Sequence, residues 1–426
     1  TASSQPVKQV SRGQEPGVFD TVDEAIRAAK EAQLRFEDCT LATREKVIAD
    51  IRAAMRPRVQ ELAQKTVEET GMGRVADKVL KLNLTLDKTP GVEDLVTECE
   101  TGDNGMTLYE LSAYGVIGAI TPSTNPAETL ICNSIGMLAA GNAIFFSVHP
   151  GAKNLSRELV SELNQVIAKS IGIENLIVTL REPSIESAQE MMLHPDVSLL
   201  VVTGGPGVVK QALQSGKKVI GAGAGNPPAF VDETADIKKA AQDIVLGASL
   251  DNNILCIAEK SVVAMRQIEP QLVQEMVKVG CVLVDNQQDI QRLVDLTVLP
   301  NGTPNKQFVG KNASVILDAA HIPYNGDPRL IILRTPKDHP FAVIEMLMPI
   351  LPVITVDSFD EGLNVCLMLE AGFHHTATMH SLNMERLNQM ARKMKTSIFV
   401  KNGPSYAGLG FSGEGTTTFT IATPTG

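Results

Sequence analysis

Short apolar runs rich in β-branched residues alternate with longer amphipathic stretches along most of this chain. Before Pro228 the runs are found in NAIFFSVHP, ENLIVTLRE, VSLLVVTGG and KKVIGAGAG, and after it in EKSVVAM, GCVLVD, RLIILR and LPVITVD. Buried strands that are interleaved with helices are typical of a parallel, doubly wound sheet. The pattern therefore predicts an α/β protein with two successive blocks, divided near Pro228.

The first 100 residues carry helical patterns instead. Thr21 and Glu24 form a capping-box pattern, which predicts that a helix begins there. A longer helical pattern runs from about residue 43 to residue 69, and Pro57 should bend it in the middle. Gly71 stands where a helix stop is expected. These helices are interpreted as a packing layer without evident chemistry.

Charge and composition exclude several classes of function. The net charge of −11 argues against a general nucleic-acid binder, which needs clustered Lys and Arg. The most apolar stretch, residues 117–148, is broken by Pro and Asn, so no membrane span is expected. The six cysteines show neither a CxxC pair nor a metal-ligand spacing, which indicates reduced thiols, an intracellular location and no metal site.

Polar and Gly-rich turns follow several of the predicted strands, and a doubly wound sheet binds its ligands at such turns. The segments are PSTNP, HPGAK, TGGPG and GAGAGNPP. Gly204, Gly205 and Gly207 lie between a strand and a helical pattern, which suits an anion held at a helix N-terminus. A tight turn would need the same glycines. The run at 221–228 has more glycines than a turn needs, so its backbone should approach another group closely.

Cys256 is the cysteine whose surroundings stand out. It follows SLDNNIL, which is rich in turn-forming Asp and Asn, whereas the other cysteines lie mostly in regular apolar or acidic stretches. On the residues alone, a buried structural cysteine remains the simpler interpretation, and a nucleophile is the alternative. His374 and His375 precede TATMHS. Either is structural or solvated by default, with a general base as the alternative.

Four ordered segments together resemble the aldehyde dehydrogenase superfamily. They are the run from PSTNPAETL to AAGN, the turn VVTGGPG, the loop NNILCIAEKS and the segment IEMLMPILPV, and the similarity extends from about residue 18 to residue 426. GAGAGNPPAFVDETAD, HHTATMHS and KNGPSYAG are similar to the CoA-acylating branch, in particular to the propionaldehyde dehydrogenases of bacterial microcompartments.

The resemblance implies oxidation of a short aldehyde, with NAD and coenzyme A, to an acyl-CoA and NADH. It implies that Cys256 is the nucleophile and that Asn125 holds the oxyanion together with the Cys256 backbone N–H. His375 would take the proton of the CoA thiol or orient a loop, and Glu345 would contact the nicotinamide ribose. The remaining implied cofactor-binding residues are Thr121, Pro122, Ser147, His149, Pro150, Gly204, Gly205, Gly207 and Gly223.

Two departures from the superfamily pattern matter for function. Hydrolytic members have a Glu where this chain reads GAGAGN at 221–226, and that Glu activates the water that releases a free acid. Without it the acyl-enzyme should persist until the CoA thiol attacks. Ser147 replaces the usual Lys on the adenosine ribose, so NAD preference over NADP is less firmly implied. The rivals are a hydrolytic aldehyde dehydrogenase, an acyl-phosphate reductase and a catalytically silent nucleotide-binding assembly protein.

The resemblance also implies a domain organisation. After a disordered lead-in over 1–18, a nucleotide-binding domain spans 19–100 and 117–227, and a catalytic domain spans 228–400. An oligomerisation arm comprises 101–116 and the Thr-rich strand 414–426, which would pair with another subunit or, alternatively, within the chain. The expected assembly is a homodimer or homotetramer in the cytoplasm, inside a bacterial microcompartment and in contact with its shell or lumen proteins.

Overall fold

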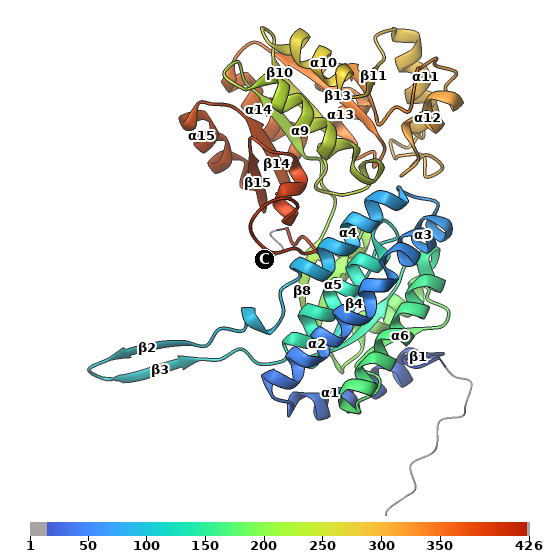
Figure 1. Cartoon of the computed structure of the whole chain (residues 1–426), viewed down its shortest axis with the longest axis vertical. Coiled ribbons are helices and arrows are strands. Elements are labelled where there is room, and N and C mark those ends of the chain that lie inside the picture. Colours follow the sequence, from blue (N-terminus) through green and yellow to red (C-terminus); the bar gives the residue numbers. More distant parts are fainter. Residues whose placement is uncertain (1–14, 424–426) are drawn as a thin grey trace, which may run out of the picture.

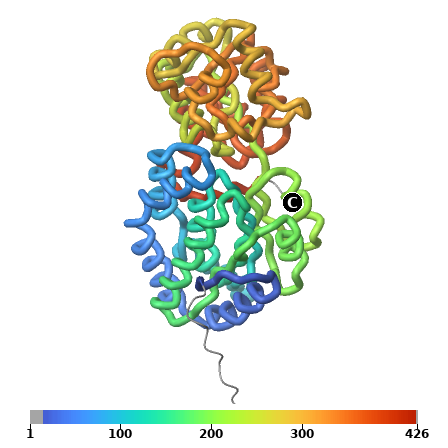
Figure 2. The backbone as a smooth tube through the Cα atoms, turned by 90° about the vertical axis from the view of Figure 1, so that its right-hand side faces the viewer, coloured from blue at the N-terminus to red at the C-terminus, as the bar shows by residue number. Residues whose placement is uncertain are grey.

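The computed structural model describes residues 15–423, and these residues form two lobes that lie end to end (Figures 1 and 2). The predicted lead-in falls largely outside the described residues. Each lobe is built around one parallel sheet with its own hydrophobic core. The predicted α/β fold class is therefore confirmed. No helix within residues 15–423 has both the length and the apolar character that crossing a bilayer requires.

The first lobe contains a six-stranded parallel sheet in the order β1-β6-β5-β4-β7-β8. The strands are β1 Val18–Phe19, β4 Val116–Ile120, β5 Ala143–Ser147, β6 Ile177–Leu180, β7 Val197–Thr203 and β8 Lys218–Ala222. The helices are α1 Val22–Glu37, α2 Leu41–Met55, α3 Val59–Thr70, α4 Val75–Lys88, α5 Pro126–Ala139, α6 Lys153–Ile171, α7 Ile185–Leu193 and α8 Pro206–Leu213. Short 3-10 turns occur at η1 Arg56–Arg58, η2 Val92–Asp94 and η3 Pro150–Ala152.

The second lobe contains a seven-stranded parallel sheet in the order β11-β12-β13-β10-β9-β14-β15. The strands are β9 Pro228–Val231, β10 Ser261–Met265, β11 Cys281–Leu283, β12 Leu330–Arg334, β13 Ile350–Val356, β14 Thr376–His380 and β15 Ile398–Lys401. The helices are α9 Ile237–Ser249, α10 Glu269–Lys278, α11 Gln287–Thr297, α12 Ala313–Ala319, α13 Pro340–Val343, α14 Phe359–Glu370 and α15 Met384–Met394, with 3-10 turns η4 Leu250–Asn253 and η5 Ser405–Leu409.

The N-terminal helices begin and end for the reasons that the sequence suggested. The Thr21 side chain accepts a hydrogen bond from the backbone N–H of Glu24 at the start of α1. The predicted bend at Pro57 is confirmed, because η1 separates α2 from α3 there. Gly71 ends α3 with a φ of 67°, a left-handed conformation in which glycine has no Cβ penalty.

A two-stranded antiparallel hairpin extends away from the first lobe (Figure 1). It consists of β2 Glu98–Gly102 and β3 Gly105–Tyr109, and every residue of both strands is exposed. The hairpin begins three residues before the predicted arm and is shorter than it. An isolated two-stranded ribbon buries too little surface to be stable alone, so a further contact for this hairpin is expected.

The C-terminal segment returns from the second lobe to the first. The backbone N–H of Thr417 donates to Lys88 O (2.9 Å), and that of Thr423 donates to Gly221 O (3.2 Å). Between residues 402 and 423 the segment contains no strand, so the alternative of an edge strand paired within this chain is wrong for the described residues. The rest of the predicted strand, residues 424–426, lies outside them.

Candidate active site

The carboxyl ends of β4, β5, β7 and β8 gather most of the predicted residues. These four strands are adjacent in the first sheet in the order β5-β4-β7-β8. The backbone N–H of Thr121 donates to Ser147 O (3.2 Å), and that of Gly204 donates to Ala222 O (3.1 Å). Pro122 follows Thr121 directly, and Gly223 follows the last residue of β8. This edge is where a doubly wound sheet holds a nucleotide.

Two observations at this edge fit a dinucleotide. The buried Thr121 Oγ1 has no hydrogen-bond partner among residues 15–423, which leaves it available to a ligand. Gly205 is the N-cap of α8 and has no side-chain cap. Pro206 has no N–H, and the Val208 N–H donates to Gly205 O (3.2 Å), so the Gly207 N–H is the group of the first turn that is open to an anion. A Cβ on Gly205 or Gly207 would meet no atom within 4 Å, whereas one on Gly204 would lie 2.8 Å from Val208. The turn is thus open on the side that a pyrophosphate would occupy.

His149 and Pro150 lie beside this edge, at the start of η3, and both are exposed. His149 Nδ1 accepts a hydrogen bond from the backbone N–H of Gly151 (3.0 Å). Partial burial, together with the charge of Lys306, lowers the pKa of His149. A neutral, exposed ring at this position can lie against an adenosine without adding charge.

Cys256 follows a loop with an unusual backbone. Asp251, Asn252 and Asn253 all have positive φ values, of 51°, 56° and 66°. Asn and Asp tolerate this left-handed region because their short side chains bond to nearby backbone groups. Asn253 Nδ2 donates to Ala248 O (2.7 Å) and to Glu259 O (2.9 Å). The Asp and Asn content that singled out this segment in the sequence therefore shapes the loop that presents Cys256.

Gly225 brings a second, smaller group of the predicted residues together. A Cβ at this position would lie 2.9 Å from Cys256 O and 2.9 Å from the ring of His375. Its backbone N–H donates to Glu345 Oε1 (3.2 Å). The structure thus places Cys256, His375 and Glu345 around one glycine, and the predicted close backbone approach in the 221–228 run is confirmed.

The charges around Cys256 leave a protonated thiol in the resting protein. Burial, reinforced by Glu345 and opposed by Lys260, raises the pKa of Cys256 to about 12. Burial also raises the pKa of Glu345 to about 7, against the attraction of Lys260. Burial lowers the pKa of Lys260 to about 8. The Lys260 ammonium donates to Asn253 O, Asn253 Oδ1 and Leu255 O at 2.7–2.8 Å, so it supports the nucleophile loop from within.

His375 is fully buried and neutral near pH 7. Burial, with the charge of Lys260, lowers the pKa of His375 to about 4. Its Nδ1 is hydrogen-bonded with Thr376 Oγ1 (2.9 Å), and its backbone N–H donates to Glu370 Oε1 (2.8 Å). Its Nε2 has no hydrogen-bond partner within residues 15–423. This nitrogen is free to meet a ligand, although so low a pKa makes the ring a weak base.

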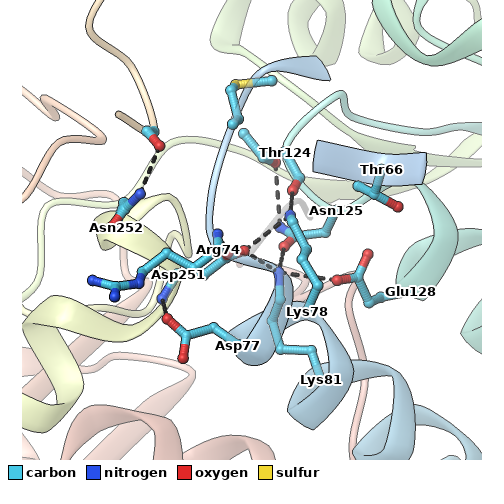
Figure 3. A network of polar contacts seen from close by, with 12 residues as sticks. Thr66, Arg74, Asp77, Lys78, Lys81, Thr124, Asn125, Glu128, Asp251 and Asn252 are labelled. Atoms are coloured by element: carbon cyan, nitrogen blue, oxygen red, sulfur yellow. Dashed lines mark hydrogen bonds and ion pairs between the residues drawn. The ribbon is translucent and has the colours of Figure 1, made fainter. Parts of the chain in front are cut away.

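Asn125 is joined to the nucleophile loop by residues that sequence reasoning missed. Lys78 and Lys81 on α4 have no exposed side-chain surface, and both reach Asp251, which lies five positions before Cys256 (Figure 3). Lys81 also contacts Asn125 and Glu128, on the α5 side. No clear signal in the sequence marked them. The two lysines fall at positions i and i+3 on the buried face of α4, which also carries Asp77 and Thr85, whereas a lysine on a helix is normally solvated.

Comparison with known proteins shows the family to which this chain belongs. A family model for the aldehyde dehydrogenase family matches residues 2–420. The chain belongs to the aldehyde dehydrogenase family. A curated propanal dehydrogenase (CoA-propanoylating) from Citrobacter freundii is 52% identical over 422 residues, which are 99% of this aldehyde dehydrogenase and 91% of the relative.

Solved structures agree with this assignment. A crystal structure of propionaldehyde dehydrogenase from Rhodopseudomonas palustris, with bound CoA and an acylated cysteine, superposes with a TM-score of 0.94 at 48% identity, covering 96% of this chain and 94% of that one. A propionaldehyde dehydrogenase from the Clostridium phytofermentans fucose utilisation bacterial microcompartment gives a TM-score of 0.95 at 47% identity, covering 97% and 94%. The predicted place of this aldehyde dehydrogenase in the CoA-acylating branch is confirmed.

Proposed function

We propose that this aldehyde dehydrogenase oxidises a short aldehyde, propanal foremost, with NAD and transfers the acyl group to CoA. The observation that carries the proposal is the packing of Cys256 and His375 against Gly225, in a loop without any carboxylate. The Citrobacter freundii relative is named for propanal and a propanoyl group, and the Rhodopseudomonas palustris structure holds CoA beside an acylated cysteine. Both support this substrate pair.

In the first half of the reaction, the Cys256 thiol releases its proton to solvent, and the thiolate Sγ adds to the aldehyde carbon and forms the oxyanion of a thiohemiacetal. Lys260 is the neighbouring cation that lowers the pKa of Cys256 against burial, so it favours the thiolate. Asn125 Nδ2 and the Cys256 backbone N–H donate to the oxyanion, and one such donor contributes about 10²–10³ in rate. Bound NAD supplies the acceptor for the hydride that leaves the former aldehyde carbon. The carbonyl then re-forms, and an acyl thioester remains on Cys256.

In the second half, the CoA thiol attacks that thioester and Cys256 leaves as a thiolate. A thiol has a reference pKa of about 8.5, so its proton must be taken as the new C–S bond forms. His375 is neutral and its Nε2 is free, so it can accept a hydrogen bond from the thiol and then the proton. With a resting pKa of about 4, His375 serves first to orient the thiol.

Water is a poor competitor for the acyl-enzyme in this site. No residue from 221 to 228 carries a carboxyl group, and Gly225 has no space for a side chain. The function of the loop is therefore to pack tightly against Cys256 and His375, and it supplies no base that could activate water. The thioester persists until the CoA thiol, a stronger nucleophile, arrives.

The deciding experiment measures NADH formation from propanal and NAD, with and without CoA, and identifies the acyl product. Sustained turnover that requires CoA, yields propanoyl-CoA and is lost in Cys256→Ala is the expected result. Turnover without CoA, with propanoate as the product, would instead show a hydrolytic enzyme. In that case Glu345→Gln would test whether the carboxylate beside Gly225 activates the water.

The dinucleotide preference is a separate proposal. Ser147 at the end of β5 is buried and carries no charge that would attract a 2′-phosphate, and we assign NAD as the substrate. The ratio of kcat/KM for NAD to that for NADP tests this assignment. A ratio below 1 would reject it.

The assembly and location belong to the same proposal. The hairpin β2–β3 supports a homodimer or homotetramer, because every residue of both strands is exposed in this chain. The Clostridium phytofermentans relative comes from a bacterial microcompartment, which supports a place inside such a compartment, beside its shell or lumen proteins. Co-purification with intact compartments would test the location.

A further inference from the structure

The side chain of Asn125 is held in one orientation by its neighbours. Asn125 is the residue before α5, is nearly buried, and makes no side-chain cap to that helix. Its Oδ1 accepts a hydrogen bond from Lys81 Nζ (2.5 Å), and its Nδ2 donates to Thr124 Oγ1 (3.2 Å). A flipped amide would direct its NH₂ group at an ammonium, which is repulsive. One N–H of Nδ2 therefore remains free and has a fixed direction.

Lys81 is kept charged where it is. Its side chain has no exposed surface, and its Nζ lies 2.5 Å from Asp251 Oδ2 and 3.0 Å from Glu128 Oε1 (Figure 3). Burial opposes the charge, but the two carboxylates outweigh it and raise the pKa of Lys81 above its usual value. Such a buried ion cluster is a poor source of net stability, because desolvating the charges costs about as much as their attraction gains.

We infer that Lys81 is a positioning residue that fixes and polarises the Asn125 amide for the oxyanion. A charge-assisted hydrogen bond to Oδ1 draws electron density away from the amide nitrogen, and the free N–H becomes a stronger donor. Asp251 binds the same ammonium and belongs to the loop that presents Cys256. Lys81 thus couples the position of the oxyanion donor to the position of the nucleophile. This inference rests on the proposed role of Asn125.

Lys78 provides a matched control on the same helix. It is equally buried, and its Nζ lies 2.9 Å from the same Asp251 Oδ2. It donates to the backbone carbonyl of Thr124 (2.5 Å), however, whereas Lys81 donates to the Asn125 side chain. Lys78→Met and Lys81→Met each remove one buried lysine nitrogen from Asp251, but only the second removes the partner of the Asn125 amide.

The test is a double-mutant cycle on Cys256 acylation, measured as the first-turnover burst of NADH from propanal at saturating NAD. Lys81→Met should slow the burst about 10–100-fold, which is part of the loss expected for an oxyanion donor. In an Asn125→Ala background Lys81→Met should cause almost no further loss of burst rate, because it acts through Asn125.

Alkylation of Cys256 by iodoacetamide involves no oxyanion, and Lys81→Met should change its rate by less than about twofold. Lys78→Met should instead lower the burst rate by the same factor in both backgrounds.

Three results would overturn the inference. The first is that the rate losses caused by Lys81→Met and Asn125→Ala multiply in the double variant. The second is that Lys81→Met lowers the rate of Cys256 alkylation as much as the burst rate. Both results indicate a structural role for Lys81. The third is a burst at the wild-type rate in Asn125→Ala. This result would show that Asn125 does not stabilise the oxyanion, and the single variant is enough to distinguish it from a failure of the role of Lys81 alone. Where Lys81→Met does not fold, the electroneutral pair Lys81→Gln with Glu128→Gln replaces it and should show the same non-additivity.

Discussion

At the scale of single residues, Gly225 is the position where the smallest change should have the largest effect. Gly225→Ala would place a methyl group 2.9 Å from both Cys256 O and the His375 ring. Overpacking of this kind costs about 1–3 kcal/mol. The displacement of Cys256 or His375 should also lower kcat at least about tenfold, since misplacement by about 1 Å can cost about 10² in rate. Thermal unfolding and steady-state kinetics measure the two effects.

Gly223→Ala is the control in the same loop, because a Cβ there would meet no atom within 4 Å. Its melting temperature should match that of the wild type, and any change should appear in the KM for NAD, where the cofactor is proposed to lie. Equal destabilisation by the two substitutions would contradict the packing argument.

Glu345 should give stability a pH dependence of known sign. Burial raises its folded-state pKa to about 7, above the usual value of 4.5, so the folded protein binds more protons than the unfolded chain between these values. Its stabilising contribution is complete below about pH 4.5 and is lost as the pH rises through 7. Glu345→Gln should remove this loss, worth on the order of 1–3 kcal/mol at pH 8 after allowance for partial exposure.

Urea unfolding at pH 5.5 and pH 8 measures this effect as the difference between the wild type and Glu345→Gln. Glu31→Gln, on the exposed face of α1, is the control and should keep the wild-type dependence. His375 and His380 have lowered pKa values, so their contributions to stability grow as the pH rises, opposite in sign to that of Glu345. These contributions are the same in the wild type and in Glu345→Gln, so they cancel in the difference between the two proteins. An unchanged dependence in Glu345→Gln would show that this carboxylate is not buried as described.

The sequence predicted Cys256, Glu345 and His375 through their motifs, and the structure groups all three around Gly225. It did not predict that Glu345 would act on the pKa of Cys256, because 89 positions separate the two residues and only the folded chain brings them together. Lys81 was missed for a different reason. A lysine on a helix is normally solvated, and its burial becomes evident only when Asp251 and Glu128 are found beside it.

At the scale of elements, the η5 turn Ser405–Leu409 depends on a carboxylate of the nucleophile segment. Ser405 donates to Glu259 through its backbone N–H (2.8 Å) and through Oγ (2.7 Å), and Glu259 is fully buried. Burial raises the pKa of Glu259 to about 7, and the Ser405 bonds oppose this rise. Ser405→Ala leaves one carboxylate oxygen without its hydroxyl donor and should cost about 1–3 kcal/mol.

The cost of Ser405→Ala should be greatest above pH 7, where Glu259 is charged, and chemical unfolding at pH 6 and pH 8.5 would reveal the difference. Thr416→Ala, at an exposed position of the same C-terminal region, is the control and should change stability by less than about 0.5 kcal/mol. A Ser405→Ala protein as stable as this control at both pH values would reject the link between η5 and Glu259.

Helices and strands were predicted correctly where their hydrophobic pattern was long or where residues such as Pro and Gly marked their ends. The helices around Pro57 were found because a proline break and a glycine stop are chemical signals within the segment. The strands β9, β14 and β15 were not predicted, because four or five residues next to Gly, His and Pro motifs look like loop. Their pairing is entirely long-range: β9 binds β10 and β14, which are 30 and more residues away.

At the scale of the whole molecule, α4 and its flanks join the two lobes. The backbone N–H of Arg74 donates to Asp251 Oδ1 (2.8 Å), and Asp77 Oδ2 accepts from the Asp251 backbone N–H (2.9 Å) and from Arg329 (3.1 Å). The first lobe supplies the proposed nucleotide edge and the second supplies Cys256. A fixed relation between the lobes is therefore a condition for hydride transfer, and these contacts at Asp251 provide it.

The hairpin β2–β3 is exposed along the whole length of both strands. Met106, Leu108, Tyr109 and Leu111 in and after β3 are 51–71% exposed, which is unfavourable for a chain on its own.

We expect this ribbon to pair with another copy of the chain, because its strand edges and its apolar side chains are then both covered. Leu108→Ser with Leu111→Ser should shift the assembly to a smaller oligomer or a monomer in light scattering after gel filtration. Leu382→Ser with Met384→Ser removes two exposed apolar side chains from the second lobe and should leave the assembly unchanged. Because Cys256 and Gly225 lie elsewhere, the smaller species should still give a first-turnover burst of NADH, at a lower melting temperature. An oligomer of wild-type size in the hairpin variant would show that the subunits associate through another surface.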